Sequence, residues 1–219
     1  MALPPDPTLD EIRAALAPAI AANAGFDGWS DVALARAAQG EGVDVDVARL
    51  AFPGGTIDMI DAWFGAIDAA MAAALPPEKL ATMKIREKIT ALVEARLALL
   101  MPHREALRRA LALLAMPGNL LRAGKLGWRA ADLMWRAAGD TATDYNHYSK
   151  RAILAAVYGA TVTVLLDDES ERHADTSAFL ARRIEGIMRF EKTKAQLIGR
   201  TSHRPSLSRF IGRLRYPVT

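Results

Sequence analysis

Cysteine is absent from the 219 residues, which excludes a thiol nucleophile, a thiolate metal site and a disulfide framework. Long uncharged runs are also missing: the longest, 152–166, has 15 residues, fewer than the roughly 20 that cross a bilayer as a helix. The first eleven residues contain acidic side chains but no Lys or Arg, unlike a secretory or mitochondrial leader. We therefore expect a cytoplasmic protein without a leader or a membrane-spanning helix.

Patterns that support catalysis or metal binding are missing as well. The four histidines lie in four different predicted elements, and none follows a glutamate by three residues, as in the di-iron sites of helical bundles. No Ser/His/Asp set has the sequence context of a catalytic triad. We predict no catalytic residue, no metal and no cofactor, so the possibility of a small enzyme on a helical bundle lacks a positive argument.

The residues that are present favour helices throughout. Hydrophobic residues make up 51% of the chain and charged residues 24%, a balance typical of a globular domain with a core. Ala and Leu dominate, alternating Val/Ile/Thr runs are scarce, and Pro or Gly interrupts the chain at helix-length intervals. The pattern predicts an all-α bundle of about ten helices, at about 8–24, 30–40, 44–51, 56–75, 77–101, 103–115, 118–138, 144–168, 174–195 and 206–215.

These helices predict three parts of the chain. A helical domain spans 1–198, with a helix-turn-helix-like part at about 8–51 and a ligand-binding bundle at about 56–198. A hinge bearing Gly, Ser and Pro follows at 199–205. An amphipathic helix and tail occupy 206–219.

Charge is distributed unevenly behind the net value of +3. Residues 1–75 contain eleven Asp/Glu against three Arg, a balance of −8, whereas residues 182–219 contain ten Lys/Arg against two Glu, a balance of +8. Only the C-terminal end is therefore expected to seek anionic surfaces such as lipid headgroups or nucleic acid.

The helices at 30–40 and 44–51 have helix-turn-helix proportions, and residues 42–63 resemble the DNA-reading module of TetR-type regulators. The expected recognition helix bears Asp44 and Asp46 with only Arg49, and non-specific DNA affinity needs Lys and Arg at the phosphates. We therefore expect no nucleic-acid binding. A ligand-sensing TetR-like transcription regulator remains the alternative function.

Three further stretches form a recognisable series: Gly-Trp-Ser at 28–30, Ala-Ala-Gly-Asp-Thr-Ala-Thr-Asp-Tyr-Asn at 137–146 followed by Tyr148, and Lys-Arg-Ala-Ile-Leu-Ala-Ala-Val-Tyr at 150–158. Together they resemble the lipid-binding accessory proteins of ubiquinone (coenzyme Q) biosynthesis, which have a TetR-like fold. The resemblance covers about 27–188, and the block around 139–151 is its most specific part.

The resemblance implies a non-catalytic protein that binds isoprenoid lipids, including quinone precursors, and supports the di-iron hydroxylase of demethoxyubiquinone. It also implies the surface on which that hydroxylase docks, here named the docking patch: Asp144, Tyr145, Asn146, His147, Tyr148 and Arg151. His147 stands where some relatives have Trp, which puts the identity or affinity of the partner in question. Taken without the family, the same residues suit a capped helix start with an aromatic side chain turned inward.

The resemblance further implies a hydrophobic pocket and a homodimer built from helices near 144–195. Apolar side chains at helical spacing also suit an ordinary core, but Met-rich stretches are typical of adaptable cavities. The candidate lipid-binding residues are Leu92, Leu99, Leu113, Met116, Leu120, Trp128, Met134, Trp135, Leu154 and Tyr158.

The C-terminal tail has the pattern of a short amphipathic helix. Its apolar residues recur at the i, i+3, i+4, i+7 spacing of one helical face, and arginines take the other positions. We expect this tail to bind anionic membranes, with the protein peripheral at the inner face of the membrane; the alternative is a terminal helix folded onto this chain or a partner subunit. The candidate membrane-binding residues are Arg204, Leu207, Arg209, Phe210, Ile211, Arg213, Leu214 and Arg215.

Overall fold

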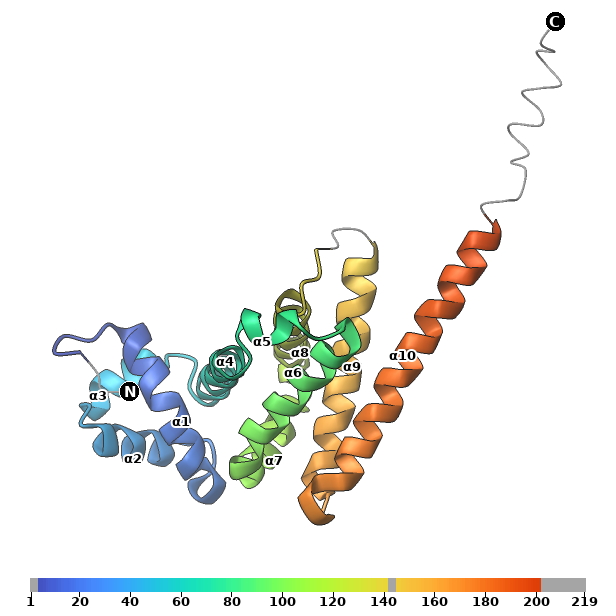
Figure 1. Ribbon diagram of the computed structural model, residues 1–219. Helices are drawn as coiled ribbons and strands as arrows, with labels where there is room; N and C mark the ends of the chain where they lie inside the picture. The colour runs from blue at the N-terminus through green and yellow to red at the C-terminus, as the bar shows by residue number, and fades with distance from the viewer. Residues whose placement is uncertain (1–3, 142–144, 202–219) are drawn as a thin grey trace, which may run out of the picture.

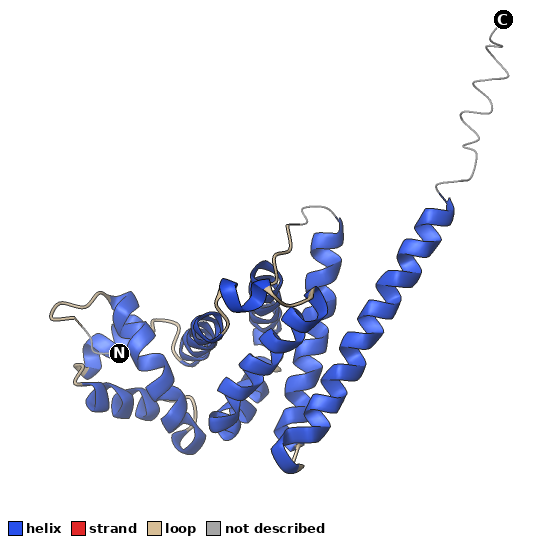
Figure 2. Cartoon of the chain, in the orientation of Figure 1, coloured by secondary structure: helices blue, strands red, loops and turns tan. Residues whose placement is uncertain are grey.

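The computed structural model of the chain describes residues 4–141 and 145–201 (Figures 1 and 2), with the side chains at 145, 146, 188 and 190–201 left undescribed. Within these ranges all regular structure is helical, which confirms the predicted fold class. The α-helices are α1 (Leu9–Asp27), α2 (Asp31–Glu41), α3 (Val45–Ala51), α4 (Thr56–Ala74), α5 (Pro77–Ala81), α6 (Ile85–Leu100), α7 (Arg104–Leu114), α8 (Leu120–Ala137), α9 (Tyr145–Asp167) and α10 (Ala174–Thr201).

The helix-turn-helix-like part is α1, α2 and α3. Thr8 and Glu11 form a reciprocal capping box at the start of α1, and the Ser30 hydroxyl caps α2. α1 packs against α4 and α7, and the indole N–H of Trp29 donates to the carbonyl of Ala106 at 2.9 Å. These contacts join the acidic N-terminal part firmly to the rest of the molecule.

The rest of the molecule is a helical bundle. α4, α6, α7, α8 and α9 pack together, and α10 lies along α9 and α6 at the outer edge (Figure 1). α10 runs antiparallel to α9 and diverges from it toward the C-terminal end (Figure 1). One apolar core extends from α1 through the bundle to α10, so the N-terminal helices do not have a separate core.

Two predicted boundaries differ from the structure. The single helix expected at 77–101 is broken between α5 and α6, because the Lys84 N–H donates to the Glu87 carboxylate at 2.9 Å and caps a new helix. The expected hinge at 199–205 does not begin at Gly199, since α10 continues through this residue to Thr201. The predicted helix at 206–215 lies outside the described residues.

α9 meets the length and composition of a membrane span, although it is a helix of the bundle. Its stretch His147–Asp167 has 21 residues, and 39% of the most apolar part is buried inside the protein. Only runs without charged residues were measured in the sequence analysis. Lys150 and Arg151 lie near the start of this stretch, so the uncharged run is shorter than the apolar helix that contains it. The helix packs against α8 and α10, so length and hydropathy alone do not distinguish a core helix from a span.

Candidate functional site

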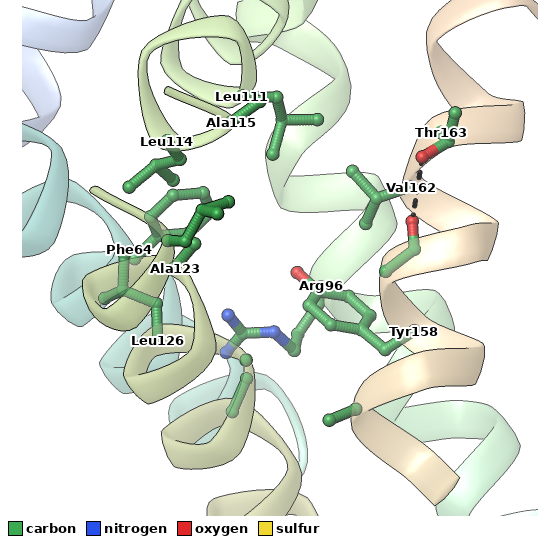
Figure 3. A pocket seen from close by; sticks show the side chains of 15 residues that line it. Phe64, Arg96, Leu111, Leu114, Ala115, Ala123, Leu126, Tyr158, Val162 and Thr163 are labelled. Atoms are coloured by element: carbon green, nitrogen blue, oxygen red, sulfur yellow. Dashed lines mark hydrogen bonds between the residues drawn. The ribbon is translucent and has the colours of Figure 1, made fainter. Parts of the chain in front are cut away.

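An apolar cavity of about 380 Å³ lies between α4, α6, α7, α8 and α9, here named the bundle cavity (Figure 3). Its volume falls within the range of small-molecule sites. Figure 3 shows Phe64 with Leu114 and Leu126 on one side and Tyr158 with Val162 on the other. The larger lining side chains are Phe64, Arg96, Leu111, Leu114, Leu120, Leu126, Tyr158 and Val162.

The cavity exists because small side chains face each other on α8 and α9. Ala123, Gly127 and Ala130 recur along one face of α8, and Ala155 and Gly159 do so on α9. A Cβ added at Gly127 would lie 3.9 Å from the Ala155 Cβ, which is ordinary van der Waals distance. Larger residues at these positions would fill the space, so the pattern of small residues is what keeps it open.

Two polar side chains form the inner end of the cavity, here named the polar floor: Arg96 from α6 and Tyr158 from α9 (Figure 3). Both are buried, and the Arg96 guanidinium lies 5.1 Å from the centre of the Tyr158 ring. Burial raises the pKa of Tyr158, so the hydroxyl keeps its proton. Among the described residues, the Tyr158 hydroxyl and the Arg96 Nε have no hydrogen-bond partner.

The charge of Arg96 is balanced by a network of ion pairs behind the floor. Arg96 donates to the buried carboxylate of Asp68, whose second oxygen accepts from Arg129 Nε at 3.0 Å. Arg129 also pairs with Asp61 at 2.7 Å, and Arg13 reaches the same carboxylate at 3.6 Å. Burial works against the charge of Arg96, but Tyr158 and Asp68 raise its pKa, so the guanidinium remains a donor.

Exposed apolar side chains surround the corner where α7 meets α8, beside the cavity. Met116, Leu120 and Leu121 are 52%, 57% and 74% exposed, and Leu120 also lines the cavity. Arg122 and Lys125 are exposed on the same turn of α8. Large apolar residues gathered at the rim of a cavity are typical of a surface that meets an apolar ligand or a membrane.

The predicted lipid-binding residues fall into different places. Leu120 and Tyr158 line the bundle cavity, and Trp135 and Leu154 line a smaller cavity of about 220 Å³ beside α10. Leu92 and Met134 are fully buried in the core, Leu99, Leu113 and Trp128 are half-buried, and Met116 is exposed at the corner. Sequence reasoning selected bulky side chains, whereas the signal of the cavity was the small ones opposite each other.

Arg96 and Phe64 were missed by the sequence analysis for different reasons. Arg96 stands among apolar residues in the second half of α6, where Glu94 is the other charge, and this position could have marked it, since a buried charge needs a partner such as Asp68 in α4. Phe64 has no distinguishing signal, because its neighbours along α4 are also apolar core residues.

The docking patch is partly described. Asp144 lies outside the described residues, and Tyr145 and Asn146 begin α9 with their side chains undescribed. Tyr148 is 62% exposed, with its ring 6.1 Å from that of Trp128 and 5.1 Å from the half-buried His147. The described part of the patch therefore presents one exposed aromatic side chain, Tyr148, which lies near the rings of Trp128 and His147.

Arg151 lies inside the fold rather than on the docking surface. It is 1% exposed and pairs with Asp132 at 2.6 Å and with Asp140 at 3.0 Å. It also donates to the carbonyl of His147 at 3.2 Å. Arg151 thus ties the end of α8 and its following turn to the start of α9, and its position limits any part in docking to holding that surface in place.

The predicted membrane-binding residues, 204–215, all lie outside the described residues. Within the described ranges, no group of three or more His, Cys, Asp and Glu is arranged to hold a metal ion. The tail therefore stays a prediction, and the structure places candidate binding features in the bundle.

Known proteins match this chain in both sequence and fold. A model of the COQ9 family matches residues 121–191, which include most of α8, all of α9 and part of α10. The rat "Ubiquinone biosynthesis protein COQ9, mitochondrial" is 33% identical over 177 residues, covering 78% of this chain and 56% of the rat protein. The human protein of the same name is 40% identical over 105 residues, covering 48% of this chain and 33% of the human one. The chain thus spans only between a third and about half of these relatives.

A solved structure resembles most of the fold. The TetR transcriptional regulator from Nitrosomonas europaea ATCC 19718 matches with a TM-score of 0.64 and 23% identity, covering 80% of this chain and 96% of the regulator. Likeness at this identity concerns the fold alone, and it confirms the predicted TetR-like architecture.

Proposed function

The chain belongs to the COQ9 family, whose model it matches over 121–191, and from this premise we propose that it is a non-catalytic accessory protein of ubiquinone biosynthesis that binds an isoprenoid quinone precursor. Family membership supports the coarser statement, a role in ubiquinone biosynthesis. The bundle cavity supports the more specific proposal, that the chain binds a quinone precursor. It is apolar, lined in part by the exposed Leu120, and walled by α8 and α9 within the matched segment.

The proposed partner is the di-iron hydroxylase that acts on demethoxyubiquinone. It would dock at the start of α9, where exposed Tyr148 is held between two neighbouring rings. Exposed aromatic side chains with a rigid support are frequent energetic centres of interfaces. Docking there would put the partner on the same two helices that wall the cavity.

The proposed location is peripheral, on the inner face of a membrane. Relatives of this chain bear the word mitochondrial in their names, which supports a place beside the membrane where ubiquinone is made. The basic tail at 204–219 would bind anionic headgroups, and the exposed leucines at the α7–α8 corner would meet the apolar layer. A homodimer through α9 and α10 completes the proposal.

The regulator alternative is weakened by the charges of α3. Arg49, the only basic residue of this helix, donates to Asp31 at 2.7 Å and to Asp46 at 2.7 Å. The helix that would enter the major groove thus offers no unbalanced positive charge, and DNA phosphates would meet Asp44 and Asp46. The likeness to a TetR regulator concerns fold and does not extend to DNA reading.

The proposal is tested by mass spectrometry of organic extracts from the full chain, purified from cells without detergent. We expect isoprenoid quinones or their precursors at close to one molecule per chain. Gly127→Phe, which places a ring inside the bundle cavity, should reduce the bound lipid about tenfold or more.

Gly124→Phe is the matched control, because Gly124 is exposed on the same helix with nothing within 4 Å of an added Cβ. It should retain the lipid. A folded wild-type protein that yields no lipid, or equal loss in both variants, would overturn lipid binding in this cavity.

A further inference from the structure

The polar floor points to the orientation in which the bundle cavity takes its ligand. We infer that the ligand enters polar end first, with an acceptor oxygen of an aromatic head group held between the Tyr158 hydroxyl and the Arg96 Nε, and with its apolar tail leaving past the α7–α8 corner. This inference rests on the proposed function, since it concerns how the same cavity recognises a quinone-like lipid.

The first argument is the unmet bonding capacity of the floor. Tyr158 and Arg96 are neighbours that influence each other's pKa, yet in this geometry neither the Tyr158 hydroxyl nor the Arg96 Nε completes a hydrogen bond within the described residues, although nearly all buried polar atoms in proteins are paired. The Tyr158 hydroxyl also points toward the cavity rather than into the core (Figure 3). Two such atoms at the inner end of one apolar cavity mark a place prepared for a polar group.

The second argument concerns which polar group fits. The Arg96 Nε–H can only donate, and Tyr158 keeps its proton because burial raises its pKa. Both therefore serve as donors to an acceptor oxygen, such as a ring carbonyl or a methoxy oxygen. The Phe64 and Tyr158 rings on opposite sides of the cavity suit a flat ring between them (Figure 3).

The third argument is size. A cavity of about 380 Å³ is near the lower end of ligand sites, so it has room for a ring and a short length of chain. A long isoprenoid tail must continue outside, and Leu120, which is exposed and lines the cavity, offers it an apolar contact, with exposed Met116 and Leu121 nearby along the chain. Entry tail first would place hydrocarbon on the two unpaired donors and leave the polar head on these leucines.

The test compares three small probes on the full chain by isothermal titration calorimetry. They are ubiquinone with a single isoprene unit, prenylbenzene, which has the same tail but no oxygen, and octanoic acid, which supplies a carboxylate instead of a ring. We expect wild type to bind the quinone more tightly than prenylbenzene. Tyr158→Phe should weaken quinone binding about 5- to 10-fold, the worth of one hydrogen bond, and leave prenylbenzene binding unchanged.

Thr161→Val is the matched control. It removes a hydroxyl from the same helix, but that hydroxyl does not line the cavity and already donates to the Val157 carbonyl at 2.7 Å. Its quinone affinity should equal that of wild type. Tyr158→Phe keeps the ring beneath the Arg96 guanidinium and removes a hydroxyl that completes no hydrogen bond within the described residues, so its melting temperature should stay close to that of wild type, which separates a binding role from a structural one.

The other outcomes of the titrations would contradict either the binding orientation, the aromatic head group or lipid binding itself. Equal quinone affinity in Tyr158→Phe and wild type, or equal affinity of wild type for quinone and prenylbenzene, overturns polar-end-first binding while leaving lipid binding intact. Octanoic acid binding that depends on Tyr158, with no quinone binding, overturns the aromatic head group. If wild type binds none of the probes, the proposed function itself is overturned.

Discussion

Arg151 shows how a family motif can combine surface residues with residues that hold the surface in place. Tyr148 and Arg151 lie three residues apart on α9, one 62% exposed and the other 1% exposed. The helical spacing places them on neighbouring positions, yet only the ion pairs to Asp132 and Asp140 explain why an arginine is buried there. Their substitution should therefore have different consequences.

Replacing the buried arginine should cost stability. Arg151→Met leaves the carboxylates of Asp132 and Asp140 without their shared partner, and breaking a buried ion pair typically costs about 3 kcal/mol. Urea unfolding followed by circular dichroism measures the change. The control is Arg136→Met, because Arg136 also pairs with Asp132 at 2.9 Å but is 69% exposed, and its loss should cost under about 1 kcal/mol. Equal losses would contradict the assignment.

The same site predicts sensitivity to acid. Burial raises the pKa of Asp140, but hydrogen bonds from Lys150 and Arg151 lower it more, so it lies below its ordinary value. A carboxylate with a lowered pKa stabilises the fold above its unfolded pKa, and this stability is lost as the pH falls from about 4 through the folded pKa. The wild type should therefore lose more stability below pH about 4 than Arg151→Met does.

Replacing the exposed tyrosine should affect docking instead. Tyr148→Ala removes a ring that contacts Trp128 and His147 but is mostly open to solvent, so the fold should keep its stability. Capture of the demethoxyubiquinone hydroxylase should weaken about tenfold or more, as for a central aromatic of an interface. Surface plasmon resonance with the purified partner measures it. Unchanged capture by this variant would remove the start of α9 as the docking surface.

At the scale of elements, most helices could be predicted because Pro, Gly and cap residues mark their ends. Gly139, one of the glycines that interrupt the chain at helix-length intervals, follows α8 with φ 91°. The break between α5 and α6 could not be predicted in the same way, because Lys84 is an ordinary helix former, yet its backbone is extended and its N–H donates to the Glu87 carboxylate at the start of α6. The cavity could not be predicted from the sequence either, because it depends on which helices face each other in the bundle.

The C-terminal tail is the element on which the membrane proposal depends. Its arginines should each contribute about 1 kcal/mol near an anionic surface. Deletion of 204–219 should abolish sedimentation with anionic vesicles, leave the melting temperature unchanged, and have no effect with neutral vesicles.

A second variant tests the apolar face of the same tail. Phe210→Ala with Ile211→Ala retains every arginine, so it should bind anionic vesicles weakly and become more sensitive to salt, since only the charge attraction remains. Normal vesicle binding by the deletion variant would place membrane affinity elsewhere, and the exposed leucines at the α7–α8 corner would be the next surface to test.

For the whole molecule, the distribution of charge along its length predicts how it approaches a membrane. The acidic helices α1–α3 and the basic helix α10 lie at opposite ends of the molecule (Figure 1). A protein with this polarity would approach an anionic membrane with α10 and keep its helix-turn-helix-like part away from it. In this orientation the bundle, rather than α3, would lie nearer to the membrane.

The same view of the molecule predicts where two copies meet. Ala152, Ala156 and Ala160 are exposed along α9, and α10 diverges from α9 toward its C-terminal end (Figure 1). Small side chains let a second helix approach closely, so we expect a homodimer with α9 and α10 at its centre.

Light scattering after gel filtration should give twice the mass of one chain for wild type and the mass of one chain for Ala156→Glu, because an unpaired carboxylate would be buried between the subunits. Ala112→Glu, on the exposed side of α7, should remain a dimer. A wild-type monomer, or a dimer that tolerates Ala156→Glu, would contradict pairing through α9. If the wild type is a monomer, a single chain would have to extract, hold and release the lipid.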